Sequence, residues 1–134
     1  MLSKPVLTIA ETTRILEAAR AEAEKNRWAV AIVVSDDGGH PLGMLRLDGS
    51  APASAYIATE KARTAAIGRR ETKVYEDMIN NGRTAFLSAP LSGTLEGGMP
   101  VIVEGQVIGA VGVSGVKSDQ DAQIAKAGIQ ALGV

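Results

Sequence analysis

The order of hydrophobic and polar residues along the chain predicts four helices and two β-hairpins. The first helix is expected over residues 8–26, because Thr8 and Glu11 have the spacing of a capping box and apolar residues then recur at helical intervals. Charged side chains occupy the opposite face, so this helix is predicted to lie against a sheet. Its predicted apolar face contains Ile9, Leu16, Ala19 and Ala23.

The first hairpin is predicted over residues 28–47. The run WAVAIVVS (28–35) has no polar interruption before its last residue, which is typical of a strand buried on both faces. The turn DDGG follows, and the alternating segment PLGMLRL (41–47) is expected to pair with the first strand. A second helix is expected over residues 54–70, and a shorter third helix from Thr72 to the NNG sequence, where Asn81 or Gly82 can take the left-handed conformation that ends helices.

The second hairpin is the clearest local signal. Residues 99–115, MPVIVEGQVIGAVGVSG, place apolar runs on both sides of a two-residue connection, Glu104–Gly105. Ser118 and Asp121 again have capping-box spacing and predict a C-terminal helix. Because the parallel βαβ alternation of nucleotide-binding domains is missing, we expect an antiparallel sheet covered by helices. The segment 83–98 is long enough to be functional or partly mobile.

Composition narrows the class of protein. The 134 residues are expected to form one domain, 1–134, with 46% hydrophobic and 22% charged residues, as in soluble globular proteins. Aromatic residues make up only 3%, so the core is expected to depend on close packing of small aliphatic side chains, or on subunit contacts. With 14 basic and 15 acidic residues and no basic block, nucleic acid is not an expected partner. The chain has no recognisable signal sequence and no apolar segment of membrane-spanning length, which predicts a cytoplasmic protein without a membrane partner.

His40 is the single histidine, and cysteine is absent. The absence of cysteine excludes thiolate zinc sites, iron–sulfur clusters and covalent c-type haem. Zinc needs three or four protein ligands, whereas haem iron needs one or two axial ligands, so haem is compatible with one imidazole. From the residues alone, His40 is a turn residue, a metal or haem ligand, or a proton carrier.

Lys61 and three glycines have both structural and functional interpretations. Lys61 lies on the expected inner face of the second helix; its ammonium either reaches water or pairs with Asp36 or Asp48, or it meets an anion at the mouth of a pocket. The glycines of the second hairpin do not have phosphate-loop spacing, and close packing is favoured over ligand approach. These glycines are Gly109, Gly112 and Gly115.

Two long segments of the chain resemble one known family. The segments VVSDDGGHPLGMLRLDGSAPASAYIATEKARTAA and GGMPVIVEGQVIGAVGVSGVKSDQDAQIAKAGIQAL are similar to the GlcG/HbpS haem-binding family, which includes the C-terminal domain of PduO proteins. The resemblance rests on residues spread over nearly the whole chain. They are the aspartate, glycine and His40 before the second strand, Arg46, Asp48, Lys61, Ala62, Gly97, Gly98, Pro100, the run Gly109–Gly115, and Asp121.

The resemblance implies an α/β (α+β) architecture: a profilin-like antiparallel sheet of about five strands, flanked by helices in α/β/α layers, in a homo-oligomer. It also implies a haem pocket in which His40 is the metal ligand. A second histidine is missing, so the other axial group would come from a partner subunit, Met44, Met99, a hydroxyl or water. The residues assigned to cofactor binding on this basis are His40, Arg46, Lys61, Gly97, Gly98 and Pro100.

Three hypotheses of function follow. The leading one is a small oligomeric protein that binds haem or a related small anionic molecule between the first hairpin and the second helix. The second is a small-molecule enzyme of a glycolate- or diol-type catabolic operon, with His40 as proton carrier and Lys61 as electrostatic stabiliser. The third is a structural accessory protein of such an operon, whose alanine-rich surfaces serve subunit association.

Overall fold

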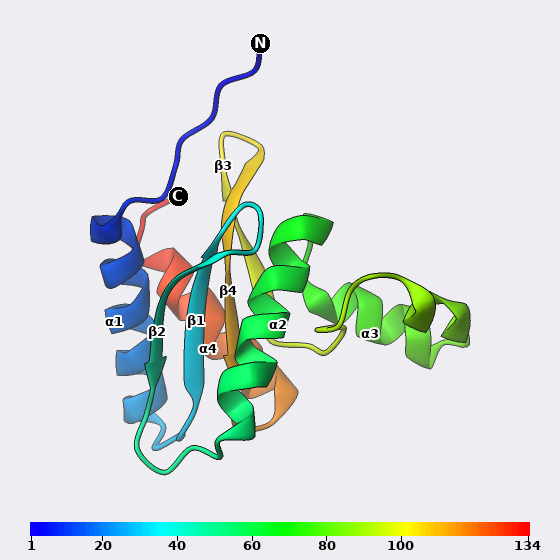
Figure 1. The fold of residues 1–134 in the computed structure, drawn as a ribbon. Coiled ribbons are helices and arrows are strands. Elements are labelled where there is room, and N and C mark those ends of the chain that lie inside the picture. The colour runs from blue at the N-terminus through cyan, green and yellow to red at the C-terminus, as the bar shows by residue number, and fades with distance from the viewer.

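The computed structural model describes all residues from Met1 to Val134. It contains four α-helices, one short 3-10 helix and four strands (Figure 1). In chain order these are α1 (Ile9–Lys25), β1 (Ala31–Asp36), β2 (Pro41–Arg46), α2 (Ala53–Gly68), α3 (Thr72–Asn80), η1 (Thr84–Ser88), β3 (Gly98–Val103), β4 (Gln106–Ser114) and α4 (Ser118–Gln130).

The strands form one antiparallel sheet in the order β2-β1-β4-β3. Helices α1 and α4 cover one face and α2 covers the other, which confirms the expected α+β architecture in three layers (Figure 1). The expected strand number, about five, is wrong: there are four. Residues 1–8 run alongside the hairpins without joining the sheet, so β2 and β3 remain its two edges.

The larger core lies between the sheet and the α1/α4 layer and is built from aliphatic side chains. Ile15, Ile32 and Ile124 are completely buried there, together with valines of β1 and β4. Strand β1 is buried on both faces, as its uninterrupted apolar run predicts. The low aromatic content is therefore compatible with a fully formed core.

The opposite face of the sheet packs against α2 through alanine. Ala58 and Ala62 of α2 contact Ala31 and Val33 of β1 in a buried cluster. Helix α2 also comes so close to β4 that a Cβ on Gly112 would overlap the backbone oxygen of Ala58. The preference for close packing over ligand approach at the β4 glycines is thus confirmed at this position.

Several predictions about helix caps and turns are confirmed, and two predictions about single residues, Ile9 and Asp121, are wrong. Thr8 and Glu11 form the expected capping box of α1, and both Glu104 (φ 52°) and Gly105 (φ 75°) are left-handed, as a type I′ hairpin turn requires. Ile9 is 74% exposed and does not belong to the apolar face of α1. Asp121 does not cap α4. The N-cap residue is Lys117, and the side-chain oxygen of Gln120 accepts the backbone N–H of Lys117 (3.2 Å).

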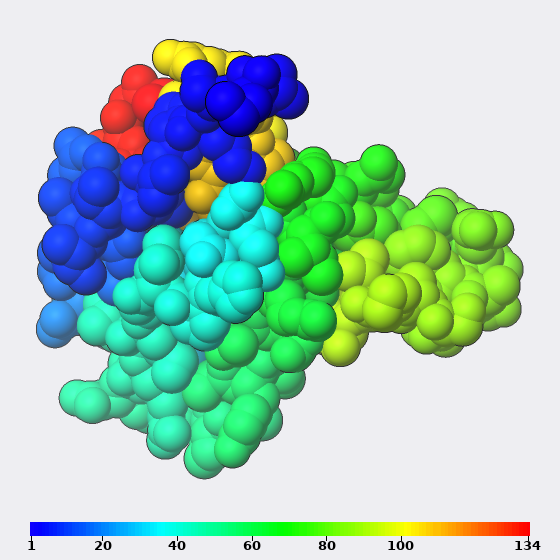
Figure 2. Space-filling model, turned by 45° about the horizontal axis from the view of Figure 1, so that its top comes forward, coloured from blue at the N-terminus to red at the C-terminus, as the bar shows by residue number.

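Helix α3 and η1 form an arm that projects from the body of the molecule (Figures 1 and 2). The ring of Tyr75 stacks on Phe86, with centroids 5.1 Å apart, and this contact joins the two helices. Tyr75 is the only buried residue between Lys73 and Ser92. Two large apolar side chains of the arm, Val74 and Leu87, are exposed.

Candidate functional site

The turn of the first hairpin holds His40 in a defined orientation. Oδ1 of Asp36 accepts the backbone N–H groups of Gly38 and His40, each at 2.9 Å. The same carboxylate lies 3.1 Å from Nδ1 of the imidazole, while the side chain of His40 is 79% exposed. Nε2 makes no hydrogen bond within the chain, so the arrangement presents a free ring nitrogen to a ligand or a proton.

Asp36 is a carboxylate suited to orienting this ring. Partial burial raises the pKa of Asp36, but the backbone N–H groups of His40 and Gly38, with the imidazole, lower it by more, so the pKa lies below its ordinary value. The carboxylate therefore stays ionised at neutral pH and can accept a hydrogen bond from Nδ1 of His40 in the tautomer that carries its proton on Nδ1. That tautomer leaves Nε2 with its lone pair available.

Lys61 is not at a pocket mouth. Its side chain is 4% exposed, and Nζ donates to the Val113 carbonyl (2.9 Å) and to Oδ2 of Asp121 (3.0 Å). Burial raises the pKa of Asp121, while the Lys61 ammonium and the Val116 N–H, which donates to Oδ1, act in the opposite direction. The expected pairing with Asp36 or Asp48 is wrong; the partner is Asp121, and the pair joins α2 to the start of α4.

Gly97 and Gly98 pack directly against this ion pair. A Cβ on Gly97 (φ 131°) would lie 2.7 Å from Nζ of Lys61, and one on Gly98 would lie 2.7 Å from Cγ2 of Thr72. The Gly98 N–H donates to the hydroxyl of Thr72 (2.8 Å). Pro100 follows on the edge strand β3, opposite Ala110. The glycines thus let β3 approach α2 and α3.

Arg46 lies at the other end of β2 from His40. Six residues of extended chain separate the two by roughly 20 Å. Arg46 lines a surface pocket of about 440 Å³, and the three principal pockets contain none of the other residues assigned to cofactor binding. Within one chain the structure therefore brings Lys61, Gly97 and Gly98 together and leaves His40 and Arg46 elsewhere, so the expected common hollow is not formed.

Two general features accompany this geometry. No helix combines the length and the apolar character needed to cross a membrane. No group of three or more histidine, aspartate or glutamate side chains is arranged to hold a metal ion.

The comparisons with known proteins agree with the architecture. A family model described as "Haem degrading protein HbpS-like" matches residues 7–130. The chain belongs to the HbpS-like family. Protein GlcG of Escherichia coli strain K12 is 60% identical to this HbpS-like chain over 114 residues, which are 85% of each protein.

Solved structures of HbpS-like relatives share the whole fold. A double mutant of HbpS from Streptomyces reticuli matches with a TM-score of 0.89 and 33% identity, covering 100% of this chain and 92% of that chain. The complex of PduOC with haem matches with a TM-score of 0.86 and 25% identity, covering 95% of each chain. These matches support the resemblance seen in the sequence.

Sequence reasoning missed the roles of two aspartates in this HbpS-like chain. The sequence predicts Asp36 only as a turn residue or a partner of Lys61, although its position four residues before His40 is the signal for a carboxylate–histidine pair across a turn. The spacing of Asp121 from Ser118 predicts a helix cap. Its pairing with Lys61, 60 residues away, has no local signal.

Proposed function

We propose that this HbpS-like protein binds haem and that His40 supplies an axial ligand through Nε2. The observation that carries the proposal is the exposed imidazole whose Nδ1 is held by the Asp36 carboxylate. Haem iron needs one or two such ligands, and the Asp36 carboxylate fixes the orientation of the ring. The family description names haem, and a structural relative was solved with haem bound.

Apolar surface beside His40 supports the fit of a flat macrocycle. Leu42 and Met44 lie on the edge strand β2 and are 37% and 47% exposed. Met44 is opposite Val33, which packs against α2, so the Met44 side chain belongs to the α2 side of the sheet. Bound haem would supply the iron chemistry, and this chain would contribute the imidazole, its orientation and part of the apolar wall.

The same geometry supports a binding site completed by a second copy of the chain. Met44 is four residues from His40 along the strand, roughly 13 Å, and Met99 lies on the opposite edge of the sheet, so neither pairs with His40 across one iron in the same subunit. The exposed apolar residues of the arm provide surface for association. Sedimentation at micromolar concentration tests association, and a strictly monomeric protein would remove this part of the proposal.

Titration with haemin tests the ligand role of His40. The wild-type protein is expected to give a sharp Soret band at one haem per site, and His40→Ala to lose the band because no other imidazole exists in the chain. Added imidazole is expected to restore the band in His40→Ala, since the free ligand replaces the missing ring. An unchanged spectrum for His40→Ala, with circular dichroism showing the native fold, would exclude this ligation and favour the enzyme or accessory hypotheses.

Asp36→Asn is expected to weaken haem binding by about 10-fold to 100-fold without abolishing it. The amide keeps an acceptor for the backbone N–H groups of the turn but removes the charge that fixes the Nδ1 proton. Asp37→Asn is the matched control, because Asp37 is on the same hairpin and pairs with Lys4 and Arg69 instead. Equal affinities of the two variants, measured by haemin titration, would contradict a role for Asp36 in orienting His40.

A further inference from the structure

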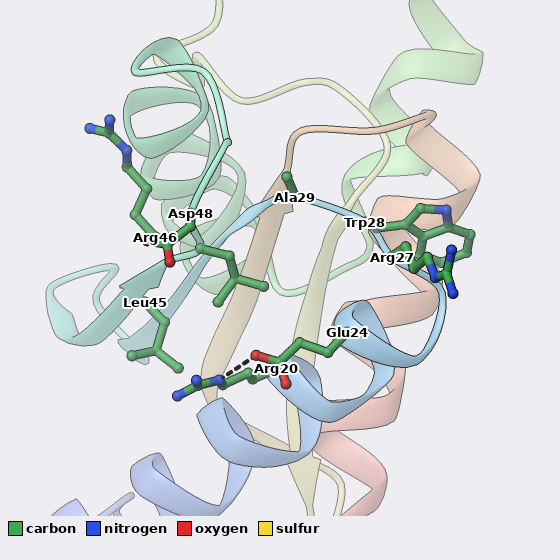
Figure 3. A pocket seen from close by; sticks show the side chains of 9 residues that line it. Arg20, Glu24, Arg27, Trp28, Ala29, Leu45, Arg46 and Asp48 are labelled. Carbon is green, nitrogen blue, oxygen red and sulfur yellow. Dashed lines mark hydrogen bonds and ion pairs between the residues drawn. The ribbon is translucent and has the colours of Figure 1, made fainter.

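The surface pocket lined by Arg46 lies at the end of β2 farthest from His40. It has a volume of about 440 Å³ and is formed by the C-terminal turn of α1, residues 27–29 and the end of β2 (Figure 3). This volume is within the range of about 300–1,000 Å³ that small-molecule sites occupy. Roughly 20 Å separate it from His40 along the strand, so it is distinct from the haem site proposed above.

The pocket combines an apolar wall with charged side chains. Trp28, Leu45 and Leu47 are half-buried and form the wall. Five charged residues line the pocket, and one of them, Arg46, directs its side chain to the α2 face of the sheet. They are Arg20, Arg27, Arg46, Glu24 and Asp48.

The arginines are not equivalent. Arg20 donates to Glu24 at 2.7 Å, so its charge is satisfied within α1. Arg27 and Arg46 make no side-chain hydrogen bond or ion pair in the chain, and Figure 3 shows them on opposite sides of the pocket, with Arg46 extended outward. Arg27 is therefore a cation without a protein partner, next in sequence to the one tryptophan of the chain.

The backbone at Arg27 supports a role for its side chain. Arg27 has φ 58° and follows the last turn of α1, where its N–H donates to the Glu24 carbonyl (3.0 Å) and the next N–H, of Trp28, donates to Ala23 (2.8 Å). Helices that end in this way usually place glycine at the left-handed residue, because a side chain there costs free energy. Arg27 therefore takes a backbone conformation that costs free energy, and its guanidinium is unpaired at the pocket.

We propose that this pocket binds a small organic monocarboxylate with an aromatic or otherwise apolar body. Arg27 donates to the carboxylate, and the body packs against Trp28 and the leucines of β2. Arg46 takes no part, because Ala31, its partner in β1, packs against α2, so the Arg46 side chain belongs to the other face of the sheet. Asp48 and Glu24 disfavour a second carboxylate on the ligand, so monoanions are selected over dianions.

The test uses the indole N–H resonance of Trp28, which is the only tryptophan and lies in the pocket. Benzoate is the probe, benzamide is its neutral analogue of the same shape, and phthalate is the dianion. Benzoate is expected to shift the resonance with a Kd in about the millimolar range or tighter, and benzamide and phthalate are expected to bind at least about tenfold more weakly.

Arg27→Gln is expected to weaken benzoate binding by about tenfold or more, and Arg27→Lys to retain part of the affinity. Arg83→Gln, which removes an exposed arginine on the arm, is the matched control and is expected to bind like the wild type. No shift with benzoate, equal shifts with benzamide, or wild-type affinity in Arg27→Gln would each overturn the proposal. None of these results depends on haem binding, so the two proposals fail separately.

Discussion

Replacing Lys61 with methionine is expected to lower the free energy of unfolding by about 3–5 kcal/mol, the cost of removing one member of a buried ion pair. The substitution leaves the Asp121 carboxylate, 3% exposed, without its counter-charge and the Val113 carbonyl without the Nζ donor. Methionine has nearly the length of lysine, so the loss arises from charge and hydrogen bonding with little change in packing. Urea unfolding followed by circular dichroism measures it.

Two further variants separate the ion pair from a general effect of losing a lysine. Lys126→Met removes an exposed lysine of α4 and is expected to change stability by about 0.5 kcal/mol or less. Lys61→Met combined with Asp121→Asn is expected to recover much of the loss, because asparagine is neutral and still accepts the Val116 N–H. A loss below about 1 kcal/mol for Lys61→Met alone would contradict an ion pair that joins α2 to α4.

The same residue marks the limit of what the sequence predicts. Helix and hairpin positions follow from periodicity and turn chemistry, which act over a few residues, and the structure reproduces them within a few residues at most boundaries. The partner of Lys61 depends on how α2 and α4 meet across the sheet. Local spacing assigned Asp121 to a cap, and only the tertiary arrangement shows that its carboxylate turns inward.

Only the local part of the candidate site could be predicted, because contacts between distant elements leave no signal in the sequence. His40 follows from being the single histidine in a turn, and the Asp36 contact lies within that same turn. The convergence of His40, Lys61 and the glycine pair required three elements to meet, and the strand β2 carries Arg46 away from His40 instead. The two hairpins predicted from the pattern account for all four strands of the sheet, and the expectation of about five came only from the family resemblance.

Gly112→Ala is expected to destabilise the protein by about 3 kcal/mol, at the upper end of the usual cost of overpacking a core. The new Cβ would overlap backbone atoms of α2, the oxygen of Ala58 and the nitrogen of Ala62, which cannot rotate away as a side chain can. Helix α2 would have to shift from the sheet and loosen its alanine packing on β1 and β4. Thermal unfolding measures the loss.

A glycine in open space distinguishes this steric effect from the general cost of replacing glycine. Gly82 (φ 111°) has no atom within 4 Å of an added Cβ. Gly82→Ala is therefore expected to lower the free energy of unfolding by about 1–2 kcal/mol, through its backbone conformation alone. Because the atoms overlapped at Gly112 belong to the main chain, trimming a side chain of α2 gives no relief, and Gly112→Ala combined with Ala62→Gly is expected to be no more stable than Gly112→Ala. Recovery in that double variant would show that side chains set the distance between α2 and the sheet. Persistent destabilisation would locate the contact in the backbones of α2 and β4, where only glycine on the strand permits it.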